Sequence, residues 1–469
     1  MVLESNAPRG RKHRRVVRFP NAPGDAMTSE SIAAARDDAH ISFTTSPIRV
    51  AHVLRKYDPC EWAGTETAVH DLLTGLREHQ VQSVVYAPNL PNTEMDLPNT
   101  MPDPLIQSGF TVRRFRSLLP ILGAHDRDRK RLMAMGGNII SFDAPWKLLR
   151  EPALDVIHSH ALNRIGGAAR LIARRRNIPF VVTIHGGYLD LPKDTADKLA
   201  APARRSVDYG RAFGWLVRSR RVVEDADAVI TINPREAELL RAKFPRLRVE
   251  LIPHGIPARR YAEDHRDSAM TEFPFLQGQT ILLFVGRIDA VKNQGFVIEQ
   301  MHRIRKLVPN AILVLAGPVT DTAYEQHLRA LIRARGLDHC VFITGALAPG
   351  DPRLVGLYQC AHLFILPSLA EPFGLVMLEA WASGCPVVAG ATSGAKQLVR
   401  PGENGYLFDV DDVNTFFDAL RRAFASEEHR KALGEAGRRR VHSVFDTNIV
   451  AQRVHDLYAE LCAHRRRSS

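Results

Sequence analysis

The stretch EPFGLVMLEAWASGCPVV, residues 371–388, decides how the second half of the chain folds. It follows the apolar run LFILPS, turns at Gly374, and continues as an apolar helical pattern that a Gly-Cys-Pro sequence ends. This order predicts a strand, a tight turn and a helix over about residues 375–383. Two acids stand in it, Glu371 in the turn and Glu379 inside the helix. Acids are rare where a helix packs against a sheet, so both need an explanation.

Outward from this stretch, short apolar runs alternate with helical patterns along almost the whole chain. The expected strands cover residues 48–54, 83–88, 155–161, 179–186, 228–234 and 249–255 in the first half, and ILLFVG, AILVLAG, CVFITGA, LFILPS and PVVAG in the second. Strands that are apolar throughout are typical of parallel sheets with helices on both faces. The predicted fold class is α/β, with two doubly wound domains joined near residues 253–279.

Composition excludes several classes of protein. With 469 residues, 45% of them hydrophobic, the chain is long enough for two or three packed domains. Of the net charge of +12, residues 1–18 hold +5 and the terminal AHRRRSS holds +3, so the folded body is weakly basic and we expect no nucleic-acid partner. The basic N-terminal tail lacks an apolar core, so we expect a disordered arm rather than a signal peptide or an anchor.

Cysteine usage and hydropathy bear on location. Five cysteines without CxxC spacing argue against a disulfide framework and a zinc site, and fit a reducing cytoplasm. No apolar run approaches the ~20 residues that cross a bilayer, so any membrane contact would be peripheral. Before Asp225, a helical pattern interleaves arginines with apolar residues (Arg204, Arg205, Arg211, Arg218, Arg220 and Arg221 with Phe213, Trp215, Leu216 and Val217). We favour an ordinary amphipathic helix here; the alternative is a face toward anionic lipid of the inner leaflet.

The two acids and the helix start suit a ligand that joins neutral hydroxyls to a diphosphate. The amides of Gly374, Leu375 and Val376 lie at the positive end of the helix dipole, where they can hold a phosphate. A carboxylate can accept hydrogen bonds from two vicinal hydroxyls, so one acid would hold a hexose and the other a ribose. For this stretch alone, a charge-dipole pair with a solvated glutamate is the alternative.

A second motif, FVGRIDAVKNQG at residues 284–295, supplies positive charge. Arg287 and Lys292 follow the first strand of the same domain, at the edge where parallel sheets bind ligands. An arginine fork and a lysine charge can clamp a diphosphate and stabilise it as it leaves. Taken alone, this pattern is equally typical of surface charge.

Together, GRIDAVKN, EPFGLVMLEAWASGCPVV and SGAKQLVRPGENGYLFDVDD resemble the C-terminal half of the retaining glycosyltransferases of family four, the glycosyl transferases group 1, which have the GT-B fold. The resemblance covers roughly residues 48–460. It implies that Arg287 and Lys292 grip the diphosphate of the donor. Glu371 would contact the transferred sugar and Glu379 the ribose. The backbone of four residues would surround sugar and phosphate: Phe373, Gly374, Leu375 and Val376.

Outside these motifs the agreement is fainter. WAGTE resembles the family's glycine-rich turn after the first strand and places Gly64 at the donor, with Ala63 where a second glycine is usual. VVTIHGG places His185 where the family has a histidine over the transferred sugar, so we assign His185 a catalytic role. At SGAKQLV, Gln397 stands where the family commonly has a glutamate.

Other polar residues near strand ends have a structural interpretation. For His158 and His160 we expect hydrogen bonds to backbone carbonyls. The strings Asp225-Ala-Asp227 and Asp409-Val-Asp411 are similar to the metal site of another glycosyltransferase fold, but they stand at turns and helix ends. We therefore expect no metal.

The sequence thus predicts a retaining, metal-independent hexosyltransferase, cytoplasmic or peripheral at the inner face of the membrane. It would move a hexose from UDP- or GDP-hexose, its co-substrate in place of a cofactor, to a saccharide, lipid-linked or small-molecule acceptor in polysaccharide or glycolipid synthesis. The expected parts are a disordered tail (1–47), an acceptor-side Rossmann-like domain (48–256), a nucleotide-sugar-binding Rossmann-like domain (257–445) and a C-terminal helix that crosses back (446–469).

Two alternatives stay open. A nucleotide-sugar epimerase shares the fold but needs acid and base residues around the sugar ring, which the sequence does not single out. A non-catalytic nucleotide-sugar-binding scaffold should have lost the clamp or one of the acids, and all four are present.

Overall fold

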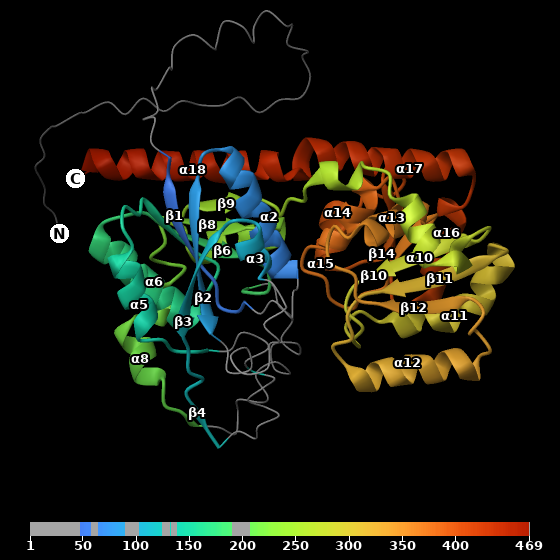
Figure 1. The fold of residues 1–469 in the computed structure, drawn as a ribbon, viewed down its shortest axis with the longest axis horizontal. Helices are drawn as coiled ribbons and strands as arrows, with labels where there is room; N and C mark the ends of the chain where they lie inside the picture. Colours follow the sequence, from blue (N-terminus) through green and yellow to red (C-terminus); the bar gives the residue numbers. More distant parts are fainter. Residues whose placement is uncertain are drawn as a thin grey trace, which may run out of the picture. The chain divides into compact units, whose positions relative to one another are not determined.

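A computed structural model describes residues 47–57, 64–89, 103–123, 132, 138–189 and 207–468. They lie in one compact unit, Pro47–Ser469, which contains two parallel β-sheets, here called the first and the second lobe (Figure 1). The tail predicted over residues 1–47 falls almost entirely outside the described residues. None of the helices in the described part has the length and apolar character needed to cross a membrane.

The first lobe is built on seven parallel strands in the order β3-β2-β1-β5-β6-β8-β9. Their bounds are β1 Arg49–Val53, β2 Gln82–Asn89, β3 Thr111–Arg116, β5 Val156–Ser159, β6 Phe180–Ile184, β8 Ala228–Thr231 and β9 Val249–Leu251. The connecting helices are α2 Gly64–Glu78, α3 Pro104–Gln107, α5 Asp143–Arg150, α6 Asn163–Arg176, α8 Arg211–Leu216 and α9 Pro234–Lys243. A short antiparallel pair, β4 Ile121–Leu122 and β7 Val207–Asp208, stands apart from this sheet.

Alternate side chains of the apolar strands pack on opposite faces of the first sheet. Val182 of β6 lies in a core that includes residues of α5 and α6, whereas Val181 lies in a core with Leu76 of α2 and Val454. Because both faces are covered by helices, the strands carry apolar residues at every position rather than at every second one.

The second lobe is built on six parallel strands in the order β12-β11-β10-β13-β14-β15. Their bounds are β10 Thr280–Val285, β11 Ala311–Ala316, β12 Val341–Gly345, β13 Leu363–Leu366, β14 Val387–Gly390 and β15 Gly405–Phe408. The helices are α10 Arg266–Glu272, α11 Gln294–Leu307, α12 Thr322–Ala334, α13 Pro352–Cys360, α14 Leu375–Ala382, α15 Ser393–Leu398, α16 Val413–Ala423 and α17 Glu427–Arg440. The predicted helix over 375–383 is therefore α14.

Each sheet has one point where its strand order reverses. In the first lobe the chain goes outward from β1 to β2 and β3, and then returns to add β5 on the other side of β1. In the second lobe the same reversal separates β10 from β13. The loops that leave the carboxyl ends of two such neighbouring strands diverge, and ligands of doubly wound sheets bind in the crevice between them.

The last helix, α18 Thr447–Ser468, packs against the first lobe. It lies alongside α2 (Figure 1), and Arg248 forms a two-fold ion pair with Glu460 at 2.8 Å for each N···O contact. Near its end, Arg465 donates to Asp227 at 3.1 Å. The chain thus returns to the first lobe after the second lobe is complete. The domain bounds 48–256 and 257–445 themselves stay a prediction.

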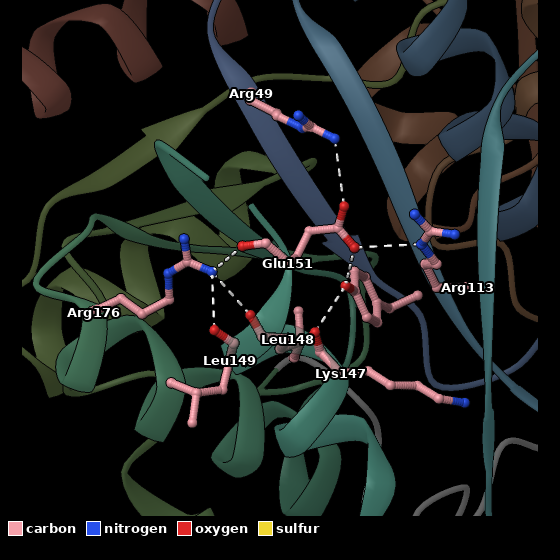
Figure 2. A network of polar contacts seen from close by, with 8 residues as sticks. Arg49, Arg113, Lys147, Leu148, Leu149, Glu151 and Arg176 are labelled. Carbon is pink, nitrogen blue, oxygen red and sulfur yellow. Dashed lines mark hydrogen bonds and ion pairs between the residues drawn. The ribbon is translucent and has the colours of Figure 1, made fainter. Parts of the chain in front are cut away.

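A buried carboxylate at the end of α5 ties this helix to strands β1, β2 and β3 (Figure 2). Glu151, 6% exposed, accepts from Tyr86 at 2.7 Å, from Arg113 at 3.3 Å and from Arg49 at 3.4 Å. The guanidinium of Arg176 donates to the carbonyls of the last turn of α5 and of Glu151. Because a buried charge is stable only when it is paired, this network has a structural role.

Candidate functional site

Two loops at the reversal point of the second sheet are joined through side chains. The loop after β10 carries Arg287 and Lys292, and the loop after β13 carries Glu371. The Nζ of Lys292 donates to Oε2 of Glu371 at 2.6 Å, and these side chains are only 15% and 11% exposed. The amide of Leu369 also donates to the carbonyl of Val291 at 2.9 Å. Residues about 80 positions apart in sequence are thereby held in one site.

Asp289 organises the loop that carries the two cations. Its Oδ1 accepts from the amides of Val291 and Lys292, both at 3.0 Å, and its Oδ2 lies 3.1 Å from Nη2 of Arg287. The fully buried Gln294 donates to the carbonyl of Arg287 at 2.7 Å. The Arg287 side chain is 48% exposed, and a guanidinium has five N–H groups, so donors remain for a ligand.

The start of α14 presents unpaired amides beside these cations. Gly374 has a φ of +98°, and a Cβ there would lie 2.3 Å from Cε of Met377, so only glycine fits this turn. No side chain caps the helix, and in the part of the chain that the structure describes nothing accepts from the amides of Gly374, Leu375 or Val376. Free N–H groups at the positive end of a helix form a site for an anion.

The loop that carries Glu371 is pressed against the start of α15. The amide of Gly394 donates to the carbonyl of Glu371 at 2.8 Å. A Cβ on Gly394 would come within 2.5 Å of the carbonyl oxygen of Phe373. This close approach of two backbones fixes the turn, and with it the direction from which Glu371 meets Lys292.

Glu379 lies deeper than the helical pattern suggests. It is 6% exposed, and the hydroxyl of Tyr358 donates to its Oε2 at 2.7 Å. Burial raises the pKa of Glu379, although hydrogen bonds from Tyr358 and Tyr261 act in the opposite direction. The structure thus shows two tyrosine partners that the sequence did not indicate, and the contact with a ribose stays a prediction.

The loop after β6 brings His185 to the loop that contains Glu371. A Cβ on Gly186, whose φ is +98°, would lie 2.8 Å from Cβ of Pro372. The ring of His254, 3.4 Å from His185 in N···N distance, stands edge-on to Phe373 with centroids 5.2 Å apart. His185 is therefore close to the proposed sugar site, and its two ring nitrogens already face other histidines.

A cluster of buried histidines lies behind His185. His158 faces Tyr458 with Nδ1 and Thr183 with Nε2, at 2.5 and 2.6 Å. His160 faces His185 at 3.0 Å and His52 at 3.2 Å. The partners of His158 and His160 are thus side chains rather than the expected backbone carbonyls. The spacing of His52, His158 and His160 would allow a metal ion, but hydrogen bonds already engage the nitrogens that would bind it.

A cavity of about 260 Å³ opens at the reversal point of the first sheet. Its lining includes Arg55, Thr65, Asn138, His160, His185 and Tyr188. Arg55 is exposed, and it makes no hydrogen bond or ion pair with the part of the chain that the structure describes. Gly64 begins α2 beside this cavity, and a Cβ there would lie 3.9 Å from Cδ1 of Leu375. Ala63 lies outside the described residues.

Gln397, a departure from the family pattern, and the acids of the Asp225-Ala-Asp227 string both have partners in the structure. The side-chain amide of Gln397 donates to the carbonyl of Ile232 at 2.9 Å and so links the two lobes. A glutamate at this position has no N–H group and could not make the contact. Asp225 pairs with Arg170 at 2.7 Å, and Asp227 accepts from the amide of Phe180 at 2.8 Å, so both acids have protein partners.

Sequence reasoning missed four residues of this region: His52, Arg55, His254 and Asp289. His52 and His254 carried a signal, because each lies within or just after an apolar strand, as His185 does. Asp289 lies three residues before Lys292, a spacing typical of a turn that caps its own backbone. Arg55 has no distinguishing pattern around it.

Two family profiles match the chain. The family described as Glycosyl transferases group 1 matches residues 266–440, and the Glycosyl transferase 4-like domain matches residues 63–255. The D-inositol 3-phosphate glycosyltransferase of Kribbella flavida is 30% identical over 299 residues, which are 61% of this chain and 67% of that protein. Its counterpart from Acidothermus cellulolyticus is 29% identical over 343 residues, 70% of this chain and 71% of that protein.

Solved structures have the same fold. Sucrose-phosphate synthase from Thermosynechococcus elongatus aligns with a TM-score of 0.67 and 23% identity, covering 89% of this chain and 100% of that one. Anabaena HepE, solved in complex with UDP, aligns with a TM-score of 0.65 and 16% identity, covering 88% and 100%. The predicted α/β class and GT-B fold are confirmed. The chain belongs to the glycosyl transferases group 1, a family of glycosyltransferases with two Rossmann-like domains.

Proposed function

We propose that this protein transfers a hexose from a nucleoside-diphosphate sugar to a polar acceptor and retains the anomeric configuration. The observation that carries the proposal is the joined loop pair of the second lobe. There Lys292, its partner Glu371 and the unpaired amides at the start of α14 converge, with the half-exposed Arg287 next to Lys292. A diphosphate needs cations and N–H donors, and a sugar needs a carboxylate, so this set matches the leaving group and the sugar of such a donor.

Lys292 can serve both parts of the donor. An ammonium group has three N–H donors, so it can keep its hydrogen bond to Glu371 and also donate to a phosphate oxygen. As the bond between the sugar C1 and the diphosphate oxygen breaks, negative charge grows on that oxygen. Preorganised donors aimed at such a charge are typically worth ~3–4 kcal/mol of the barrier. Arg287, Lys292 and the helix start are placed to supply this stabilisation.

We infer a front-side transfer. The acceptor oxygen forms its bond to C1 on the face from which the diphosphate leaves, and the acceptor proton passes to the departing diphosphate. His185 has both ring nitrogens engaged by histidines, so it would line the sugar site rather than take this proton. No step in this route calls on a metal, since arginine and lysine neutralise the diphosphate.

The acceptor would enter through the cavity at the reversal point of the first sheet. Arg55 brings a guanidinium to this cavity, where it interacts with the charge of Glu66, and its planar fork suits a phosphate or a carboxylate. The two relatives above are named for an inositol phosphate, which agrees with this chemistry. We therefore propose a small polyol phosphate, or a lipid-linked or saccharide acceptor with an anionic group.

Changing Arg55 to glutamine tests the acceptor. Loss of a hydrogen bond to a charged group costs about 1.5–3 kcal/mol, so kcat/KM for inositol phosphate should fall roughly 10- to 150-fold in Arg55→Gln. Transfer to unphosphorylated inositol, measured in the same assay, should hardly change. Equal losses for both acceptors would contradict an anion contact at Arg55.

A peripheral contact with the inner membrane face is also proposed. The expected arginine-rich helix is in fact the six-residue α8 followed by the turn Ser219–Arg221, and Arg204 and Arg205 lie outside the described residues. On it, Trp215 and Leu216 are 83% and 65% exposed. Exposed apolar groups beside arginines suit the surface of an anionic bilayer. The four described cysteines are free, which fits a cytoplasmic location.

One experiment separates transfer from its alternatives. The purified protein is incubated with UDP-, GDP- or ADP-glucose, with and without acceptor, and the released nucleoside diphosphate is measured. We expect UDP or GDP to accumulate only when acceptor is present. An altered sugar without any acceptor would favour the epimerase, and tight nucleotide binding without release would favour the scaffold.

A further inference from the structure

Four histidines of the first lobe form one hydrogen-bonded chain. The N···N distances are 3.2 Å from Nδ1 of His52 to Nε2 of His160, 3.0 Å from Nδ1 of His160 to Nε2 of His185, and 3.4 Å from Nδ1 of His185 to Nε2 of His254. At the inner end, the hydroxyl of Ser83 lies 3.4 Å from Nε2 of His52. The rings come from β1 and from the loops after β5, β6 and β9, so the chain extends from the middle of the sheet toward its β9 edge.

The contacts link the same pair of atoms at every step, Nδ1 of one ring with Nε2 of the next. A neutral imidazole has one N–H donor and one acceptor nitrogen. If His52 carries its proton on Nδ1, His160 must accept on Nε2 and therefore carries its own proton on Nδ1. The same reasoning extends to His185 and to His254. Only two arrangements satisfy every bond, one with all protons on Nδ1 and one with all on Nε2.

The chain is uncharged at neutral pH. Burial lowers the pKa of His52 to about 3 and that of His254 to about 4, and it lowers those of His160 and His185 well below the usual value. The positive charge of Arg55 adds to the effect at His185. A second proton on one inner ring would leave every link intact but would give the rings on its two sides opposite tautomers, so it is burial that keeps the chain neutral and lets all four rings share one tautomer.

The two ends of the chain differ. The hydroxyl of Ser83 can donate or accept, so it selects neither arrangement. His254 is partly exposed, and within the described part of the chain its Nδ1 has no hydrogen-bond partner. Its ring stands edge-on to Phe373, in the loop between Glu371 and the start of α14. The open end of the chain therefore lies at the donor side.

We propose that His52, His160, His185 and His254 act as one tautomer-coupled positioning unit, in which the group that meets Nδ1 of His254 selects the tautomer of all four rings. A sugar or phosphate oxygen there accepts a hydrogen bond and selects the arrangement with all protons on Nδ1. His52 and His160 then fix the proton of His185 without touching a ligand. The inference rests on the proposed function only for the identity of that ligand.

The cluster contains its own matched control. His158 is fully buried, and its ring lies 4.2 Å from that of His160 between centroids. Its nitrogens face Tyr458 and Thr183, so it is outside the chain. A change at His158 disturbs packing as much as a change at His160, but it breaks no link between the four rings.

The test is nitrogen NMR of protein labelled with ¹⁵N only in histidine, because a protonated and an unprotonated ring nitrogen have distinct shifts. Single variants of each histidine assign the signals. We expect the four chain rings to share one tautomer in the unmodified protein. In His160→Gln the side-chain amide can still bond to His52, but Nε2 of His185 loses its hydrogen-bond partner. The tautomers of His185 and His254 should then no longer follow the tautomer of His52. In His158→Gln the four rings should keep one tautomer.

Two results would overturn the inference: opposite tautomers within the chain of the unmodified protein, or equal effects of His160→Gln and His158→Gln. Thermal unfolding of both variants shows whether a change in tautomer comes from the broken hydrogen bond between rings or from a general loss of stability. If His158→Gln does not fold, Tyr458→Phe supplies a milder control. UDP is added last. Failure of UDP to bind would contradict the proposed donor, whereas the tautomers measured without UDP test the chain by themselves.

Discussion

Lys292 is the residue on which the donor site depends most. It is largely buried, and its side chain joins the loop after β10 to Glu371. In Lys292→Gln, kcat should fall about 100- to 1,000-fold, because a preorganised donor to the leaving diphosphate is lost. Arg287→Gln should change kcat in the same direction. The matched control is Lys306→Gln, which removes an exposed lysine from α11 in the same lobe. A similar loss in Lys306→Gln would count against the clamp.

Glu379 differs from Lys292 because it already accepts a hydrogen bond from a buried tyrosine, so its role in donor binding must be separated from a structural role. If it also holds the ribose, Glu379→Gln should raise the donor KM roughly 10- to 100-fold with a smaller change in kcat, since a charged acceptor of hydrogen bonds is lost. Tyr358→Phe removes the bond to Glu379 but leaves the carboxylate. Steady-state kinetics with varied donor compare the two. An unchanged KM in Glu379→Gln, with stability lowered in both variants, would make Glu379 structural.

Among the elements, α8 is the one for which we propose a contact with an anionic bilayer. Arg218 and Arg220 are exposed and have no ion pair in the described part of the chain, and they follow the exposed Trp215 and Leu216. Each arginine near an anionic bilayer contributes ~1 kcal/mol, so Arg218→Gln with Arg220→Gln should weaken binding to vesicles by roughly 30-fold. Co-sedimentation with phosphatidylcholine vesicles, with and without phosphatidylglycerol, measures this. Met270→Ser alters an exposed apolar residue of the second lobe and should bind like the unmodified protein.

The elements also show which sequence signals were reliable. Buried parallel strands were predictable because both their faces are apolar, and α14 was predictable because a glycine turn and a Gly-Cys-Pro end bracket it. The strand β3, TVRRFR, was missed because it lies at the edge of the sheet and alternates arginine with apolar residues. The segment around α8 was expected as one helix, but its pattern of arginine and aromatic residues does not encode the turn at Arg218, whose φ is +49°.

Only part of the site was predictable, because local sequence patterns show where strands end but not which strands are neighbours. Arg287, Lys292 and Glu371 follow strands, and the carboxyl ends of neighbouring parallel strands meet at one edge, so their convergence could be inferred. Local sequence patterns do not show the order of the strands in the sheet. The approach of His52, His160, His185 and His254, from four separate segments, therefore had no local signal beyond a histidine at each strand end.

At the scale of the whole molecule, the buried histidines should make the fold sensitive to acid. His52 and His254 have a pKa of about 3 and about 4 in the folded state, against about 6.5 when unfolded. Below pH 6.5 the unfolded chain binds protons that the folded chain does not, so the free energy of unfolding should fall as the pH drops from about 6.5 to about 4. Above pH 6.5 this contribution is fully present. The pKa of Glu379 is raised, so this one group changes the free energy of unfolding with pH in the direction opposite to the histidines.

Urea unfolding at pH 8, 6.5 and 5 measures this acid sensitivity. The midpoint should change little between the first two conditions and drop clearly at the third, with an unchanged slope. A midpoint that stays constant down to pH 5 would mean that the histidines are charged or exposed in the folded protein.

We expect the second lobe to hold the diphosphate of the donor. A crystal structure of the protein soaked separately with UDP and with GDP tests it most directly. One of them should bind with its diphosphate at the amides of Gly374 and Leu375 and within hydrogen-bond distance of Arg287 and Lys292. A nucleotide bound elsewhere, or that pocket left empty at saturating UDP and GDP, would contradict it.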